Sequence, residues 1–227
     1  MRTIEIRAPR DNRRMSRRQH ILIVAADDYG YARGYNRGIL EAAEAGALDG
    51  VSAMVGRSRC EAEPLLETGV EIGLHLELPG EPPAAQLERF EALFGRPPAY
   101  IDGHKHCHAG PAAGQEVIEI AARLGIPVRS VDAGHRERLR RAGVATPDRL
   151  IGRLDPSEPA LPPELAQGRQ LPAGVTEWMV HPGHPDPEAG SSYDGARRED
   201  LDLVLRVGPL LARDGSRATH RAALGAG

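Results

Sequence analysis

Short apolar runs alternate with amphipathic segments along most of this 227-residue chain, and this alternation restricts the fold more than any other feature. The run at 20–26 is almost wholly apolar, as in a strand buried on both faces. Segment 36–46 has one apolar helical face and ends at a glycine. Repeated strand–helix pairs predict parallel βαβ units in an α/β fold. The further predicted strands are 51–55, 71–78, 99–102, 126–131 and 175–181, and the further predicted helices are 61–68, 84–94, 114–124, 134–141 and 196–211.

Ionisable side chains stand at the carboxyl ends of four of these predicted strands. They are Asp27 and Asp28, His75, His104 and His181. Ligands bind at this edge of parallel sheets and barrels, because the loops and helix N-termini converge there. We therefore expect these side chains to meet around one site.

Three histidines occupy alternate positions in the segment 102–108, which reads DGHKHCH. Neutral imidazole is a common metal ligand, and a core would have to satisfy each ring separately. If the segment is extended, His104 and His108 stand about 13 Å apart, which is too far for one ion whose ligand bonds are about 2 Å. We therefore select His104, nearest the strand end, as the ligand. His106 is expected to support the site or face the substrate.

One carboxylate and two imidazoles with open positions suit a divalent ion in hydrolytic or oxidative chemistry. A second carboxylate can then act as general base and another histidine as general acid. We favour Mg or Zn, with Mn, Co and Ni as alternatives. Two other functions stay open: hydrolysis of another ester or a phosphoester, and metal binding without catalysis. No glycine-rich phosphate cradle with Lys and Ser/Thr is found in the sequence, which disfavours phosphate.

Composition restricts the partners and the compartment. A net charge of −3 provides no overall positive field, so we expect no nucleic-acid partner. No apolar run is long enough to span a bilayer. Two cysteines, Cys60 and Cys107, do not form a disulfide framework, which indicates a reducing, cytoplasmic compartment. We expect one domain over 19–227 after a disordered basic leader at 1–18, with Met15 as an alternative start, and the number of subunits stays open, a homodimer included.

Collinear motifs from about residue 20 to 211 give the chain a family resemblance. They are ADDYG at 26–30, GLHL at 73–76, QLERF at 86–90, GRPP at 95–98, IDGHKHCH at 101–108 and EWMVHPG at 177–183. On these motifs the chain resembles the YdjC-type carbohydrate deacetylases, which include chitooligosaccharide deacetylases and hopanoid-associated deacetylase-like proteins.

The resemblance implies a distorted, incomplete (βα) TIM-like barrel of mostly parallel strands with one divalent metal. By motif match Asp28, His75 and His104 hold the metal, Asp27 activates water, and His181 protonates the departing amine. The implied reaction is hydrolysis of the N-acetyl group of an amino sugar or a short amino-sugar oligosaccharide.

Some positions depart from the family pattern or are assigned to the substrate. His184 follows His-Pro-Gly where an aromatic residue is more usual, and it offers a second acid. Tyr29 and Tyr193 are candidates for stacking on a sugar, and Arg129 for orienting a carboxylate or hydroxyl. The segment between His75 and His104 is short, which disfavours long oligosaccharides.

Overall fold

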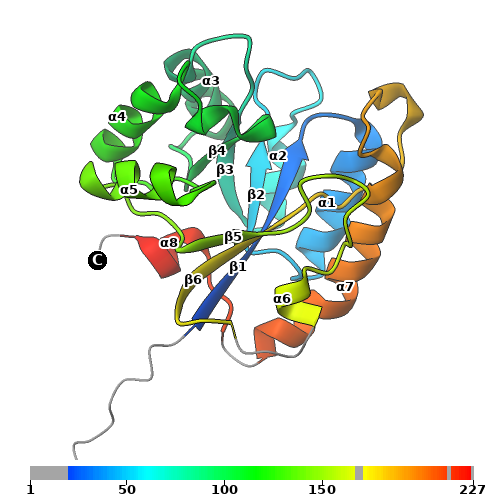
Figure 1. Cartoon of the computed structure of the whole chain (residues 1–227). Helices are drawn as coiled ribbons and strands as arrows, with labels where there is room; N and C mark the ends of the chain where they lie inside the picture. The colour runs from blue at the N-terminus through cyan, green and yellow to red at the C-terminus, as the bar shows by residue number, and fades with distance from the viewer. Residues whose placement is uncertain (1–19, 167–170, 214–215, 226–227) are drawn as a thin grey trace, which may run out of the picture.

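The computed structural model describes residues 20–166, 171–213 and 216–225, and within them six parallel strands form one curled sheet (Figure 1). The strand order is β4-β3-β2-β1-β6-β5. The sheet is an incomplete barrel, which confirms the predicted fold class. The predicted leader at 1–18 and the alternative start at Met15 lie outside the described residues. The strands are β1 (His20–Tyr29), β2 (Gly50–Ala53), β3 (Glu71–Leu76), β4 (Ile101–Gly103), β5 (Arg149–Ile151) and β6 (Gly174–Val180).

Strands β1 and β6 share the longest pairing in the sheet. They pair in parallel over seven residues, from His20 opposite Gly174 to Ala26 opposite Val180. Apart from its first two residues β1 is buried throughout, as expected for a strand with helices on one face and a filled barrel on the other. Because Ala26 pairs with Val180, this register places Asp27 of β1 level with His181, the residue that follows β6, at the same edge of the sheet.

Helices cover the outside of the curled sheet. Figure 1 shows α3, α4 and α5 on one side and α1 and α7 on the other. Helices α3 and α4 each end at a glycine in the left-handed conformation, Gly95 and Gly125. The α-helices are α1 (Arg33–Glu44), α2 (Ala62–Glu67), α3 (Pro83–Phe94), α4 (Gly114–Leu124), α5 (Ala133–Arg141), α6 (Pro163–Ala166), α7 (Arg197–Arg213) and α8 (His220–Leu224), and the 3-10 segments are η1 (His104–Ala109), η2 (Pro187–Ala189) and η3 (Asp194–Ala196).

The fifth strand differs from the sequence prediction. Residues 126–131 run beside β4, but Val128 makes only an isolated bridge, to Ile101. The strand that pairs with β6 is instead β5, inside a region that looked irregular in sequence. Three residues are too few to show a period of two, so pairing with β6 defines this strand and its local pattern does not.

The amino end of the barrel is filled by aromatic rings. Tyr100 projects across the interior, and a Cβ at Gly73 would lie 2.4 Å from its ring. A Cβ at Gly50 would lie 2.8 Å from the Tyr100 hydroxyl oxygen, so both glycines make room for this ring. On the other side His220 of α8 stacks on Tyr100, with 3.6 Å between ring centroids. Figure 1 shows α8 near the end of the sheet where β1 begins.

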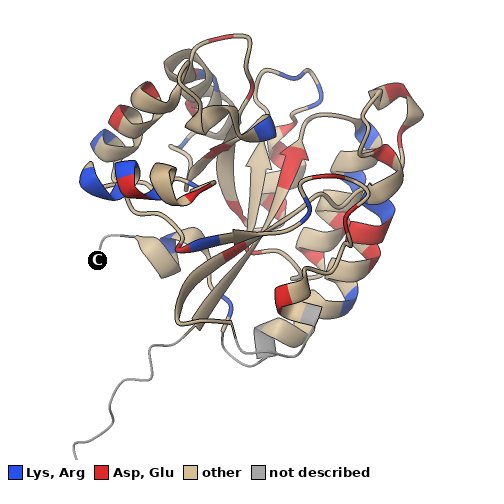
Figure 2. Cartoon of the chain, in the orientation of Figure 1, with Lys and Arg blue, Asp and Glu red and all other residues tan. Residues whose placement is uncertain are grey.

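Charged side chains lie mostly on the outer helices. Figure 2 shows them distributed over α5, α1 and α7, with acidic and basic residues interspersed on the last two. Among the described residues no helix combines the length and the apolar character needed to cross a membrane.

Candidate active site

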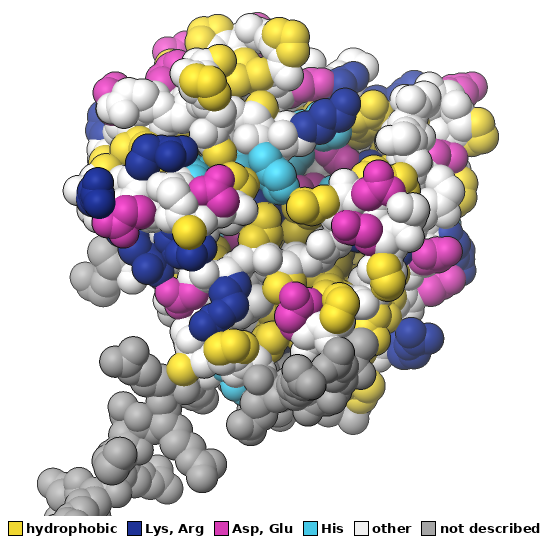
Figure 3. All heavy atoms as spheres, viewed as in Figure 1, with side chains coloured by type: hydrophobic (Ala, Val, Ile, Leu, Met, Phe, Trp, Pro, Cys, Tyr) yellow, Lys and Arg dark blue, Asp and Glu magenta, His cyan; other side chains and the backbone are white. Residues whose placement is uncertain are grey.

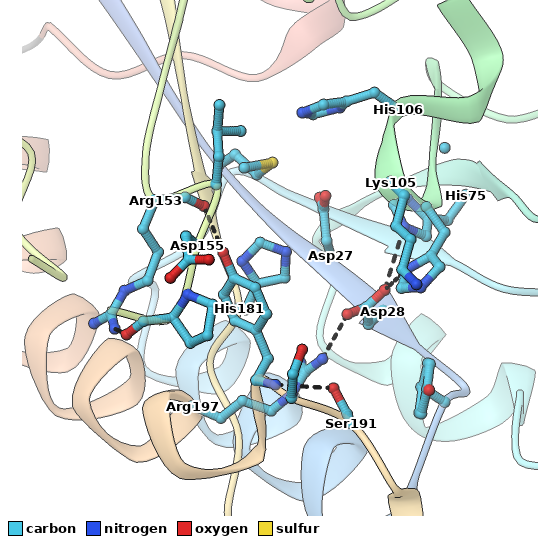
Figure 4. A pocket seen from close by; sticks show the side chains of 18 of the residues that line it. Asp27, Asp28, His75, Lys105, His106, Arg153, Asp155, His181, Ser191 and Arg197 are labelled. Atoms are coloured by element: carbon cyan, nitrogen blue, oxygen red, sulfur yellow. Dashed lines mark hydrogen bonds and ion pairs between the residues drawn. The ribbon is translucent and has the colours of Figure 1, made fainter. Parts of the chain in front are cut away.

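Three of the predicted residues meet at the carboxyl end of the barrel. Oδ1 of Asp28 lies 2.9 Å from Nδ1 of His104 and 3.3 Å from Nε2 of His75. One ligand atom from each of the three residues lies within 4.8 Å of the others. Figure 4 shows Asp27, Asp28 and His181 directed toward the same space. The prediction that the strand ends converge is therefore confirmed for these residues.

A local distortion of β1 allows adjacent aspartates to reach one site. On a regular strand Asp27 and Asp28 would point to opposite faces. Here Asp28 has φ +72°, and the pairing of β1 with β2 shifts register between Ala26 and Tyr29. Aspartate is one of the few non-glycine residues found with some frequency in the left-handed region, and such residues cluster at functional sites.

The histidine segment is not extended, so the distance argument made from sequence was wrong in its premise. Residues 104–109 form η1, and both Lys105 and His106 are left-handed, with φ +50° and +57°. His104 does reach Asp28, as expected, and His106 lines the adjacent cavity. His108 points away: Nε2 donates to the carbonyl of Arg129 over 3.0 Å, and burial lowers its pKa to about 3.

The donor set fits a divalent cation. His75 Nδ1 is held by Oδ1 of Asp102 at 2.7 Å, an arrangement that orients metal-binding histidines. Its Nε2 is buried and makes no hydrogen bond within the described part of the chain. Burial alone would lower the pKa of His75, but the carboxylates of Asp102 and Asp27 raise it well above its usual value. The site therefore attracts positive charge at this imidazole.

The charges buried around the site also fit a cation. Four buried carboxylates, those of Asp27, Asp28, Asp102 and Glu177, face two buried guanidiniums, those of Arg129 and Arg197. A histidine that binds a metal ion is neutral, so in the metal-bound form these groups leave two negative charges, which one divalent ion would balance. Buried charge without compensation is costly, so the charge balance favours an ion here.

Arg129 holds Asp27 from below and does not face the substrate, which corrects the role expected from sequence. It is 1% exposed, and its two terminal nitrogens bind the Asp27 carboxylate at 2.6 and 2.8 Å. It also contacts Asp102 at 2.8 Å and Glu177 at 2.7 Å. Burial would raise the pKa of Asp27, but the positive charge of Arg129 outweighs it and lowers that pKa far below its ordinary value. Asp27 is therefore ionised.

His181 and Tyr193 border the cavity together. Their ring centroids are 4.7 Å apart, and the Tyr193 hydroxyl donates to the carbonyl of Arg153 over 3.0 Å. The backbone N–H of His181 donates to Asp200 over 2.9 Å, which fixes the loop after β6. Burial lowers the pKa of His181 to about 4, so its imidazole is neutral near neutral pH.

Two predicted substrate residues do not line this cavity. The Tyr29 ring is buried, and its hydroxyl donates to the carbonyl of Glu61 over 2.8 Å. The shift in register after Asp28 turns this ring toward the sheet's outer side, under α1 and α2. His184 Nε2 is 2.8 Å from Oε2 of Glu41 on α1, which draws this second candidate acid toward the surface.

A cavity of about 620 Å³ opens over these residues. Asp27, Asp28, His75, His104 and His181 line one part of it. Apolar and hydroxyl-bearing side chains also line the cavity. Tyr31 lies beside His104 and Tyr193 beside His181, and the others are Leu154, Pro156, Met179 and Ser191. Figure 3 shows histidine side chains exposed at a hollow in this face, with acidic side chains beside them. A cavity of this size suits a small molecule.

Sequence reasoning missed several residues that support the site. Arg197, the first residue of α7, donates to Oδ2 of Asp28 at 2.5 Å and lies 3.6 Å from the centre of the Tyr35 ring. Arg153 is buried and binds Asp200 at 2.8 Å. Glu177 stands in the EWMVHPG motif, but the motif alone gives it no role. Each of these residues acts through a partner distant in sequence, so the local pattern does not show what it does.

Comparisons with known proteins show the family and the fold of the chain. The sequence profile of the YdjC-like protein family matches residues 21–84 and 81–208. A chitooligosaccharide deacetylase of Enterobacter sp. (strain 638) is 32% identical over 237 residues, covering 81% of this chain and 90% of that protein. A carbohydrate deacetylase of Geobacillus stearothermophilus is 31% identical over 231 residues, covering 80% and 88%.

A solved structure shares the fold of this chain. It comes from Enterococcus faecalis V583, is described provisionally as a cellobiose-phosphate cleavage protein, and superposes with a TM-score of 0.75 at 20% identity, covering 91% of this chain and 99% of that one. The family resemblance seen in the sequence motifs is confirmed by the profile match and the two relatives. This chain belongs to the YdjC-like protein family.

Proposed function

We propose that this protein is a metal-dependent hydrolase that removes the N-acetyl group from an amino sugar or a short amino-sugar oligosaccharide. The observation that carries the proposal is the meeting of Asp28, His75 and His104 beside Asp27 and His181 in one cavity. The names of the relatives, chitooligosaccharide and carbohydrate deacetylase, support the same chemistry.

Asp28, His75 and His104 would hold the cation, for which we propose Mg or Zn. When bound, such an ion supplies a Lewis acid that polarises the acetyl carbonyl and acidifies water. Asp102 holds the His75 ring so that Nε2 is left for the ion, and Arg197 occupies the second oxygen of Asp28. The chain thus provides three oriented donors and leaves other positions open to water and substrate.

Asp27 is proposed as the base that accepts a proton from the attacking water. Arg129 grips both carboxylate oxygens, which keeps Asp27 ionised and fixes its direction toward the cavity. The water oxygen bonds to the acetyl carbon, the bond from that carbon to the sugar nitrogen breaks, and the proton ends on the departing amine. Acetate and a free amino sugar are released.

His181 is proposed as the group that carries the proton to the departing nitrogen. Its lowered pKa, about 4, means that it enters the reaction neutral and gains a proton only as Asp27 gives one up. The attraction of Asp27 and Asp28 would stabilise the charged imidazole while it forms. Tyr193 lies against the ring, and His106 lies across the cavity, where both can contact the sugar.

The substrate is proposed to be short. The cavity lining combines polar side chains with those of Tyr31, Leu154 and Tyr193, so a sugar could bind with its hydroxyls against the polar groups and a C–H face against a tyrosine ring. We also propose a cytoplasmic location. Cys60 and Cys107 are both free thiols in the structure, which fits a reducing compartment.

The test is an acetate-release screen with acetamido sugars of one to four units, run with each of Mg, Zn, Mn, Co and Ni after chelation. Esters and phosphoesters serve as the comparison panel. We expect acetate only from short acetamido sugars and only with metal present. Turnover confined to phosphoesters would overturn the proposal, and so would metal binding without any product.

The acid is tested by a matched pair of histidine variants. His181→Gln should lower kcat by about 10²-fold or more, in the range for a lost general acid. His184→Gln should leave kcat near the wild-type value, because His184 is outside the cavity lining. The reverse result would move the acid to His184.

A further inference from the structure

Helix α8 places one titratable side chain inside the amino end of the barrel, beside the Tyr100 ring. His220, the first residue of α8, is 1% exposed. The family profile ends at residue 208, so His220 lies beyond the matched region. We therefore infer its role from its contacts.

A continuous row of side-chain contacts joins His220 to the proposed base. Nε2 of His220 lies 3.7 Å from Oε2 of Glu177. The other oxygen of Glu177 accepts a hydrogen bond from Nε of Arg129 at 2.7 Å. The far end of the same guanidinium holds both oxygens of Asp27. Three successive contacts therefore cross the barrel from its amino end to the cavity.

The position of His220 is fixed from several sides. Its ring stacks on Tyr100 with an interplanar angle of 15°. Nδ1 faces Oε2 of Glu71 at 3.8 Å. The helix itself begins with a Thr219 cap, whose side chain accepts from the backbone of Ala222. The imidazole is thus held between the carboxylates of Glu71 and Glu177.

The second carboxylate oxygen of Glu177, Oε2, faces the His220 imidazole. Glu177 is fully buried, and its Oε2 makes no hydrogen bond among the described residues. Arg129 is shared by three carboxylates, so it cannot neutralise Glu177 alone. Without His220, Glu177 would compete more strongly for Arg129, and the grip of Arg129 on Asp27 would loosen.

We propose that His220 is a positioning residue for the active site: it holds Glu177, which sets Arg129, which in turn aims Asp27 at the cavity. This inference builds on the proposed function, because it assumes that Asp27 is the base. The C-terminal segment is thereby part of the catalytic architecture, although it lies at the opposite end of the barrel.

The test compares His220→Phe with His220→Gln in the full-length, metal-loaded protein. Phenylalanine keeps the stack on Tyr100 and removes the polar edge, whereas glutamine keeps a donor near Glu177. We expect His220→Phe to lower kcat about 10-fold, in the range for residues that orient a site from outside it, with KM unchanged. His220→Gln should restore most of the rate. Equal rates in all three proteins would overturn the proposal.

A control and a cycle separate positioning from simple stability. Leu65→Ala removes buried apolar side-chain volume at α2, away from His220, Glu177 and Arg129, so it should lower the melting temperature and leave kcat alone. Glu177→Gln combined with His220→Phe should cost no more than the larger single change, because both act through Arg129. Additive losses in kcat would contradict the proposed route, as would a Leu65→Ala protein with the kcat of His220→Phe.

A crystal structure of His220→Phe gives a readout that needs no activity. We expect Arg129 to shift toward Glu177 and to lose one of its two contacts with Asp27. If the wild-type protein proves inactive on every acetamido sugar, the proposed function fails while this structural result still decides the inference. An unchanged Arg129–Asp27 pair would overturn it.

Discussion

The two ends of the barrel use similar side chains in opposite ways. At the carboxyl end Asp28, Lys105 and His106 adopt left-handed backbone conformations, and polar atoms face a cavity. At the amino end Tyr100 and His220 stack face to face, and the glycines of β2 and β3 give them room. One end stores backbone strain around an open polar cavity, and the other is filled. We infer that the tightly packed amino end keeps the strained backbone of the carboxyl end in place.

The comparison would be broken most severely by a change at Asp27. Asp27→Asn should lower kcat by about 10²- to 10⁴-fold, because it removes the proposed base. Metal affinity should stay near the wild-type value, since Asp28, His75 and His104 are intact. Rates of acetate release and calorimetric metal titration measure the two effects. A rate close to that of the wild type would remove Asp27 from the mechanism.

Asp102 lies between the two ends, and its loss should weaken the metal site. Asp102→Asn removes the charge that orients His75 and is expected to reduce metal affinity about 10- to 100-fold. Competition with a chelator of known affinity would measure this. Unchanged affinity would mean that Asp102 serves only to pair with Arg129.

At the filled end, Gly73→Ala should affect stability first. The added methyl group would lie 2.4 Å from the Tyr100 ring, which must move. Overpacking of this kind costs about 1–3 kcal/mol, measured as a lower free energy of unfolding in urea. Metal affinity of the folded protein should change much less than its stability, because the added methyl group meets the Tyr100 ring and none of the three proposed metal ligands. A large loss of affinity would show that the two ends are more tightly coupled than proposed.

The smallest effect concerns pH. His108 is buried and neutral, with a pKa of about 3 in the folded chain against 6.5 when exposed. The unfolded chain therefore binds this proton first, and the stability that His108 contributes is lost as pH falls from about 6.5 toward 3. Unfolding free energies measured between pH 7 and 4 should fall less steeply in His108→Asn. A slope equal to that of the wild type would show that other groups account for the acid sensitivity.

The sequence predicted the parallel sheet, the end of the sheet that carries the site, and the meeting of Asp28, His75 and His104. It could do so because strand ends and polar residues coincide in the linear order. It did not predict β5 or the turn of η1, because pairing and tertiary contacts define them. Arg129 was expected to orient a carboxylate or hydroxyl of the substrate, and the carboxylate that it holds is instead that of Asp27. The sequence could not show this, since the side of a short extended segment that faces inward depends on the register with β4.

The contact between Arg197 and Asp28 has one more consequence. Because the guanidinium holds Oδ2 and the two imidazoles face Oδ1, the carboxylate cannot rotate freely. Helix α7 starts at this arginine, so the orientation of one ligand atom is tied to the placement of a seventeen-residue helix on the barrel's outer surface. A shift of that helix against α1 would first change how many carboxylate oxygens Asp28 can present to the proposed cation.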